Sequence, residues 1–153
     1  MCFLGVDIGG TSVRSLVTDA GGKILGYQRI ARVSHESLWQ AINDCLGTVL
    51  AQSSVVHVEA AVVGAAGAGP TGNHDVCQSV EKAFRAVGLD VTPQVVTDIE
   101  IAYWSAAVLG DGSILVAGTG AIAGRFSEWR CVDRRGGAGW LLGDPGCGVW
   151  IGC

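Results

Sequence analysis

The amino-acid sequence predicts an α/β fold built on a mixed sheet, and two patterns carry this prediction. Three strand-like segments joined by tight glycine turns come first, over residues 3–8, 13–18 and 23–30. Consecutive strands with such short connections pair antiparallel. Helical and strand-like segments then alternate, which is the order of strands joined by helical crossovers. We therefore expect a sheet whose first three strands are antiparallel, with helices flanking it.

A helix is expected after the third strand, ending near Gln52. Either Ser34 or Ser37 can cap its N-terminus, because a serine side chain there can accept a hydrogen bond from a free amide of the first turn. One face is apolar and recurs at helical spacing. Its residues are Leu38, Ile42, Cys45, Leu46 and Val49.

Two further strand–helix pairs follow. Residues 55–64 are an almost continuous apolar run, which is typical of a central parallel strand. Residues 75–87 predict a helix that ends at Gly88, and residues 91–97 a short strand. The next helix is expected over residues 100–109. Its inward residues are predicted to be Ile101, Trp104 or Tyr103, and Val108.

The last third of the chain predicts a second hairpin. Its strands are expected over residues 113–117 and 121–126, and residues 129–132 add a further strand. The tail from Gly136 to Cys153 is rich in glycine and carries one notable carboxylate, Asp144.

Composition narrows the classes of protein and partner. A length of 153 residues fits one domain, and 49% hydrophobic with 16% charged residues predicts a well-filled core. A net charge of −4 with scattered basic residues argues against a nucleic-acid groove or an anionic membrane as partner. No apolar run is long enough to span a membrane, and no signal peptide is visible. The six widely spaced cysteines are therefore expected to be reduced thiols of a cytoplasmic protein without a structural metal.

The first hairpin turn is the first candidate site. Asp7 ends an apolar strand, and Gly9, Gly10 and Thr11 form the turn. Glycines let a ligand approach the backbone amides, which suits phosphate, and a carboxylate suits Mg²⁺ held through water. An ordinary tight hairpin explains the same residues equally well.

Other glycine-rich loops suggest different chemistry. Gly67 to Gly72 matches the dinucleotide fingerprint G-x-G-x-x-G between a strand and a helix, which would make the chain an NAD-binding module. Pro70 removes one amide donor from this loop, and a three-stranded meander precedes it. A P-loop is excluded, because neither Lys23 nor Lys82 has the required neighbours.

Four motifs in order resemble one family over the whole span from Gly5 to Gly152. They are Asp7 to Thr11, Val96-Thr97-Asp98, Val116 to Gly120, and Gly137 to Gly152. Together they resemble the branch of the actin-like ATPase and sugar kinase superfamily that joins N-acetylglucosamine kinase with the BadF/BadG/BcrA/BcrD-type ATPases. The resemblance implies a ribonuclease H-like (actin-like ATPase) domain, with ATP and Mg²⁺ as cofactors.

The resemblance also implies roles for individual residues. Asp7 would orient hydrated Mg²⁺, and Asp98 would take the proton from an attacking sugar hydroxyl. The amides of both turns would hold the phosphates of ATP. The residues of those turns are Gly9, Gly10, Thr11, Gly118, Thr119 and Gly120. The sugar-binding residues would be Asp144, Ser34 and His35. Asp98 and Asp144 can alternatively cap a helix or form a turn.

The function expected from the resemblance is an ATP-dependent kinase that phosphorylates N-acetylglucosamine or a related hexosamine. Pro145 and Cys147 depart from the family pattern and leave the particular sugar open. An ATPase that activates a CoA-ester reductase or dehydratase is the alternative, and an NAD-binding module or an inactive fragment are others. Family members carry a second domain, so residues 1–153 are expected to be the N-terminal domain, poorly active alone. A homodimer of the full-length protein is compatible with the family.

Overall fold

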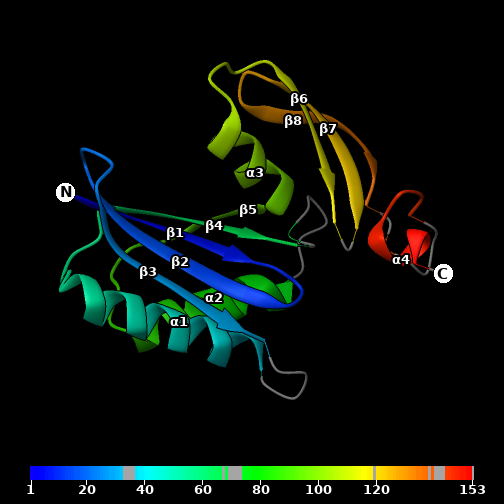
Figure 1. Ribbon diagram of the computed structural model, residues 1–153. Helices are drawn as coiled ribbons and strands as arrows, with labels where there is room; N and C mark the ends of the chain where they lie inside the picture. Colours follow the sequence, from blue (N-terminus) through cyan, green and yellow to red (C-terminus); the bar gives the residue numbers. More distant parts are fainter. Residues whose placement is uncertain are drawn as a thin grey trace. The chain divides into compact units, whose positions relative to one another are not determined.

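The computed structural model describes residues 1–32, 37–66, 68, 74–118, 120–137, 139 and 144–152. The chain divides into two compact units, Met1–Asp98 and Ile99–Cys153. Figure 1 shows the elements of both, and each unit is described by itself below. No helix in the described part of the chain is long and apolar enough to cross a membrane.

The first unit is built on a five-stranded sheet with the order β3-β2-β1-β4-β5 (Figure 1). Strands β1 (Cys2–Ile8), β2 (Ser12–Asp19) and β3 (Ile24–Ala31) pair antiparallel. Strands β4 (Ala60–Ala65) and β5 (Gln94–Thr97) continue the sheet in parallel with β1. The predicted mixed sheet with three antiparallel strands at its start is confirmed.

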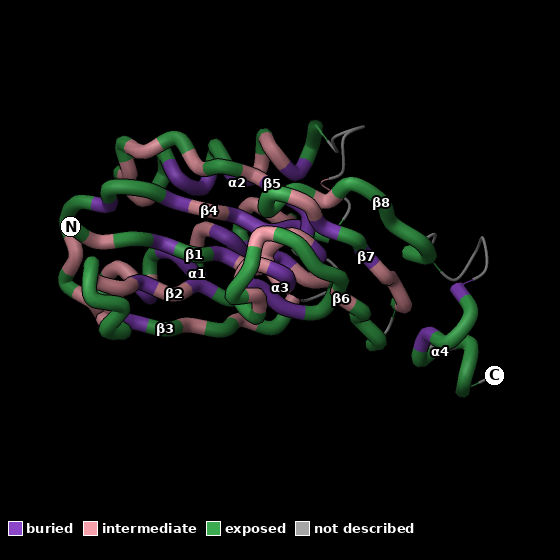
Figure 2. The backbone as a smooth tube through the Cα atoms, turned by 90° about the horizontal axis from the view of Figure 1, so that it is seen from above, coloured by how far each residue is buried: buried purple, intermediate pink, exposed green. Residues whose placement is uncertain are grey.

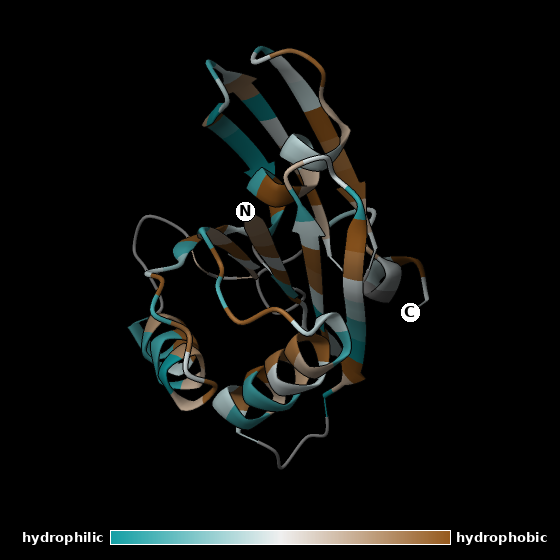
Figure 3. Ribbon diagram, turned by 90° about the vertical axis from the view of Figure 1, so that its left-hand side faces the viewer, coloured by the Kyte–Doolittle hydropathy of each residue, from teal (hydrophilic) through white to brown (hydrophobic). Residues whose placement is uncertain are grey.

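Two helices, α1 (Leu38–Ser53) and α2 (His74–Ala86), cover one face of this sheet (Figure 1). Both carry hydrophilic and hydrophobic residues, so each can bury one side and expose the other (Figure 3). Buried residues lie on both helices and on the strands β1, β2 and β4 (Figure 2). They include Val6, Val13, Ile42, Leu46, Val63, Val80 and Phe84.

The start of α1 and the end of α2 agree with the residues that the sequence indicated. Ser37 is the residue that caps α1, and its backbone amide donates to the Gln40 side chain at 3.2 Å. Of the two serines that the sequence offered, Ser37 therefore fills this role. Gly88 lies two residues after the last residue of α2 and has a φ of +76°, a left-handed conformation that suits glycine and ends a helix.

Strand β4 corrects the sequence-based boundary. A strand was expected from residue 55, but β4 begins at Ala60, and Val56 is 95% exposed. The reason is the length of β1: Phe3 pairs with Ala60, and the Glu59 amide donates to the Cys2 carbonyl at 2.8 Å. Residues before Glu59 therefore have no strand to pair with, however apolar they are. Strand β5 likewise begins only at Gln94, opposite Val62.

The second unit contains helix α3 (Asp98–Ala106) from Ile99 onward, three antiparallel strands and the short helix α4 (Gly148–Ile151). The strands are β6 (Gly112–Ala117), β7 (Ala121–Ser127) and β8 (Arg130–Gly136), in the order β6-β7-β8. The predicted hairpin and its added strand are confirmed, and the added strand is longer than expected.

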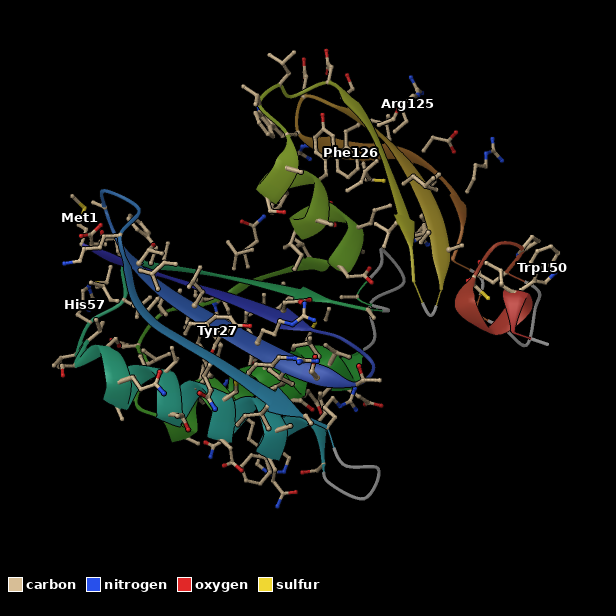
Figure 4. The ribbon with its side chains drawn as sticks, in the orientation of Figure 1. Met1, Tyr27, His57, Arg125, Phe126 and Trp150 are labelled. Atoms are coloured by element: carbon tan, nitrogen blue, oxygen red, sulfur yellow. The ribbon has the colours of Figure 1, made fainter. Side chains whose placement is uncertain are left out.

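Helix α3 packs on this small sheet through two aromatic rings. Tyr103 stacks on Phe126 with ring centroids 3.9 Å apart, and Phe126 lies on the α3 side of β7 (Figure 4). Gly124 permits the close approach, because a Cβ there would lie only 2.8 Å from Ile99 Cδ1. The buried residues of α3 are Ile99 and Tyr103. Val108 was expected inside but is 90% exposed, because the helix ends at Ala106.

The core of the first unit allows a matched test of burial. Val49 is fully buried on α1, whereas Val56 is almost fully exposed. Val49→Ala should lower the free energy of unfolding by about 2 kcal/mol, because it removes two buried methyl groups and leaves a cavity. Amide hydrogen exchange in β1 measures this change. Val56→Ala is the same chemical change in the same unit. It should change the free energy of unfolding, measured by the same exchange, by no more than about 0.5 kcal/mol.

Candidate functional site

The turn between β1 and β2 is held by hydrogen bonds that use some of its amides and leave others available. The Gly9 amide donates to the Ser12 carbonyl at 2.9 Å and closes the turn. Among the described residues, the amides of Gly10 and Thr11 have no acceptor. Gly9 therefore shapes the turn, and Gly10 and Thr11 are the residues whose amides can receive an anion.

Arg32, directly after β3, holds this turn from outside. Its Nη1 donates to the Gly9 carbonyl at 3.2 Å, and its backbone amide donates to the Thr11 carbonyl at 2.9 Å. A cation that binds carbonyl oxygens stiffens the turn without occupying amide donors. The sequence analysis missed Arg32, and no motif marks it, because its role follows from where β3 ends.

Asp7 is paired with a cation across the hairpin. Asp7 and Arg14 are direct cross-strand partners, and Arg14 Nη1 lies 3.1 Å from Asp7 Oδ2. The Asp7 and Arg14 side chains are 36% and 49% exposed. Arg14 donates to Oδ2, and the described residues provide no donor for Oδ1, so that oxygen is available to a water or to another donor. The sequence analysis also missed Arg14, although the register of a hairpin whose turn contains Gly9 and Gly10 places Arg14 opposite Asp7.

Asp98 lies at the same sheet edge as the first turn. Ile8, Ala65 and Thr97 are in register across the parallel strands β1, β4 and β5. The strands β1, β4 and β5 therefore end at the same edge of the sheet. Gly9 directly follows β1, and Asp98 directly follows β5. Neighbouring strands lie about 4.8 Å apart, so these two backbones are separated by about 10 Å. Asp98 is exposed and is also the first residue of α3. The carboxylate predicted as a base thus shares an edge with the predicted phosphate turn.

The turn between β6 and β7 belongs to the second unit and has a similar pattern. The Gly118 amide donates to the Gly120 carbonyl at 2.8 Å, so it closes the turn. The Gly120 amide has no acceptor among the described residues. Thr119 lies outside the described residues. Of the candidates in this turn, Gly120 is therefore the described residue that can offer its amide to a phosphate.

Asp144 is buried beside the second turn. Its side chain is 3% exposed, and Oδ2 accepts from the Ala121 amide at 2.8 Å while Oδ1 accepts from the Gly137 amide at 3.1 Å. These contacts agree with turn formation, one of the two roles that the sequence allowed. The role of Asp144 as a sugar ligand stays a prediction.

Several candidates fall on parts of the chain that are not described. Ser34 and His35 lie outside the described residues, as do Gly67, Gly69 and Gly72 of the dinucleotide-like loop. Among the described residues, no three His, Cys, Asp or Glu side chains gather into a metal-binding group. Cys45 is buried, and burial raises the pKa of its thiol, which makes it a poor nucleophile.

Comparison with known proteins identifies relatives of this chain. The sequence matches no protein-family profile. It is 29% identical over 157 aligned positions to the N-acetylmuramic acid/N-acetylglucosamine kinase of Clostridium acetobutylicum, covering 97% of this chain and 50% of that protein. The chain is therefore similar in sequence to a sugar kinase. It spans about half the length of the relatives that it matches.

Solved structures agree on the fold. A protein described as an N-acetylglucosamine kinase from Porphyromonas gingivalis superposes with a TM-score of 0.76 at 20% identity, over 98% of this chain and 55% of its own. The ROK family glucokinase from Streptomyces griseus, solved with glucose and AMPPNP, gives 0.61 at 25% identity, over 90% and 48%. The expected actin-like ATPase fold and the resemblance to N-acetylglucosamine kinases are confirmed.

The ion pair at the first turn predicts a change in cation binding. Arg14→Gln should strengthen Mn²⁺ binding by about two- to fivefold, because the substitution removes a positive charge next to Asp7. Electron paramagnetic resonance of free Mn²⁺ in a titration measures this affinity. Arg85→Gln is the matched control, since Arg85 makes the same 3.1 Å contact with Glu81 on α2. Equal or weaker Mn²⁺ binding in Arg14→Gln would show that Arg14 does not compete with the cation.

Proposed function

We propose that this chain is part of an ATP-dependent kinase that phosphorylates a hydroxyl of N-acetylglucosamine or a related hexosamine. The observation that carries the proposal is the sheet edge at which β1, β4 and β5 end. A turn with two available amides and an exposed carboxylate, Asp98, lie at that edge. The sequence relative in Clostridium acetobutylicum is named for this activity and supports the choice of sugar.

Phosphate binding is assigned to the amides at the tips of both turns. In the first turn these are the amides of Gly10 and Thr11, and in the second turn those of Thr119 and Gly120. Gly9 and Gly118 contribute by shaping the turns, because their amides already donate within them. Phosphoryl transfer needs positioning and charge neutralisation more than covalent catalysis, which backbone amides can supply.

The cation site fits Asp7. This carboxylate is partly exposed, and one of its oxygens is free of hydrogen-bond donors from the described residues. Mg²⁺ retains most of its waters in proteins, so Asp7 would hold it through water, and the bound cation would neutralise phosphate charge. Arg14 keeps Asp7 oriented toward the hairpin and balances its charge when the cation is absent.

Asp98 is assigned the role of general base. A carboxylate at the end of a parallel strand can accept the proton of a sugar hydroxyl as its oxygen attacks the γ-phosphorus of ATP, with ADP leaving. The exposed position of Asp98 leaves it accessible to a small substrate. Ser34 and His35 remain the proposed sugar contacts, together with Asp144 as an alternative to its structural role.

The wider organisation of the protein is also a proposal. Because the chain spans about half of its relatives, we expect residues 1–153 to act as the N-terminal domain of a longer kinase. A second domain would complete the adenine site and exclude water, so these residues alone should turn over slowly. A cytoplasmic location and a homodimer of the complete protein accompany this proposal.

Substitution of Gly10 tests the first turn as a phosphate site. A Cβ at Gly10 meets no atom within 4 Å, so Gly10→Ala should fold normally. The methyl group would stand beside the available amides and weaken Mg–AMPPNP binding about five- to tenfold. Isothermal titration calorimetry measures the affinity. Gly47→Ala is the control, because Gly47 is equally open but lies on α1 away from the turn. Unchanged affinity in Gly10→Ala would exclude this turn as a phosphate site.

Substitution of Asp98 tests the chemical step. Asp98→Asn should lower the sugar-dependent release of ADP by about 10²- to 10⁴-fold, because an amide cannot accept the proton. Mg–AMPPNP affinity should not change. The assay uses the longest polypeptide that the gene encodes and a panel of N-acetylglucosamine, N-acetylmuramic acid, glucosamine and glucose.

Asp90→Asn provides the control for the loss of a carboxylate charge, since Asp90 is an exposed residue of the same unit, before β5. Normal turnover in Asp98→Asn would remove Asp98 as the base. Release of ADP that no sugar stimulates would contradict the kinase and favour an ATPase that drives a partner protein.

A further inference from the structure

We infer that Asp144 is a positioning residue that holds the Gly118–Gly120 turn in the shape that binds phosphate. The part of this inference that concerns phosphate rests on the proposed function. Asp144 lies 24 residues after Gly120 in the sequence, so its role follows from the folded structure of the second unit.

The Asp144 carboxylate joins two strands behind the turn. Oδ2 accepts from the amide of Ala121, the first residue of β7, at 2.8 Å. Oδ1 accepts from the amide of Gly137, directly after β8, at 3.1 Å. Gly137 also donates to the Ala121 carbonyl at 2.8 Å. The carboxylate therefore fixes the exit of the turn to the end of the neighbouring strand.

A backbone contact from the same segment holds the entrance of the turn. The Cys147 amide donates to the Asp144 carbonyl at 3.0 Å and closes a short turn over residues 144–147. The next amide, that of Gly148, donates to the Gly118 carbonyl at 2.7 Å. Residues 144–148 thus contact both Gly118 and Ala121, the residues on either side of the turn tip.

Gly120 makes room for this carboxylate. A Cβ on Gly120 would lie 3.2 Å from Asp144 Oδ2, which is closer than most real contacts of a Cβ. With no side chain there, the carboxylate can reach the Ala121 amide. The Gly120 amide itself has no acceptor among the described residues, so the contacts behind the turn leave a donor available at its tip.

An ionised carboxylate suits this position better than any neutral side chain. Both of its oxygens accept, so it can satisfy two amides at once, whereas an asparagine has one accepting oxygen and a donating NH₂ group. A buried side chain with each oxygen facing an amide also offers little surface to a sugar hydroxyl. Asp144 as a positioning residue and Asp144 as a sugar ligand therefore predict different effects of the same substitution.

Asp144→Asn separates the two roles. We expect the amide of Ala121 or that of Gly137 to exchange hydrogen at least tenfold faster, measured by NMR on the ¹⁵N-labelled chain, because an asparagine can accept from only one of the two and turns a donating NH₂ group toward the other. Mg–AMPPNP should bind about fivefold more weakly, since the turn loses its fixed shape. N-acetylglucosamine affinity, measured by calorimetry, should stay within about twofold, which a sugar ligand would not allow.

Two further variants test whether a general loss of structure could explain these effects. Asp133→Asn makes the same chemical change at an exposed residue of β8 in the same unit, and all three measurements should remain unchanged. Gly120→Ala keeps the carboxylate but pushes it from the Ala121 amide, so exchange at Ala121 should again accelerate. Circular dichroism establishes that each variant is folded.

The outcomes distinguish this inference from the proposed function. Unchanged exchange at Ala121 and Gly137 in folded Asp144→Asn would overturn the inference, and so would weakened sugar binding with unchanged nucleotide binding. If the unsubstituted protein binds no Mg–AMPPNP, the proposed function and the nucleotide part of the inference both fail. Hydrogen exchange alone then decides whether Asp144 holds the turn.

Discussion

The parallel pairing of β1, β4 and β5 is the constraint on which the first candidate site depends. In a parallel ladder the strands run in the same direction, so their carboxyl ends meet at one edge of the sheet. Ile8, Ala65 and Thr97 are in register at that edge. The hairpin turn after β1 and the carboxylate after β5 consequently lie close together, although about 90 residues separate them in the sequence.

The two glycine turns are held by side chains of opposite charge. In each, the amide nearest the incoming strand closes the turn, and among the described residues the amides of Gly10, Thr11 and Gly120 at the tips have no acceptor. The first turn is held by a cation, because Arg32 binds its carbonyl oxygens. The second is flanked by an anion, because Asp144 binds the amides of Ala121 and Gly137. Since backbone polar groups must find partners when buried, both arrangements satisfy polar groups at the base of a turn.

Charge near the first turn is balanced within the hairpin itself. Arg14 lies opposite Asp7 and contacts one of its oxygens, so the carboxylate is held without being buried. A half-exposed ion pair of this kind stabilises the fold only slightly. Its effect is instead local, because Arg14 orients one oxygen of Asp7 and leaves the other without a donor among the described residues.

The sequence by itself determined the elements and the kind of protein, because local patterns encode both. Helical spacing, turn glycines and the alternation of strands and helices predicted the mixed sheet, and four ordered motifs predicted the sugar kinase relatives. Tertiary structure decided what depends on distant partners. Strand β4 begins at Ala60 because β1 offers no partner earlier, and Val108 is exposed because α3 ends before it. The contacts of Arg32 and of Asp144 likewise follow from the path of the chain, which no local pattern contains. The pairing of Arg14 with Asp7 follows from the hairpin register and could have been found in the sequence.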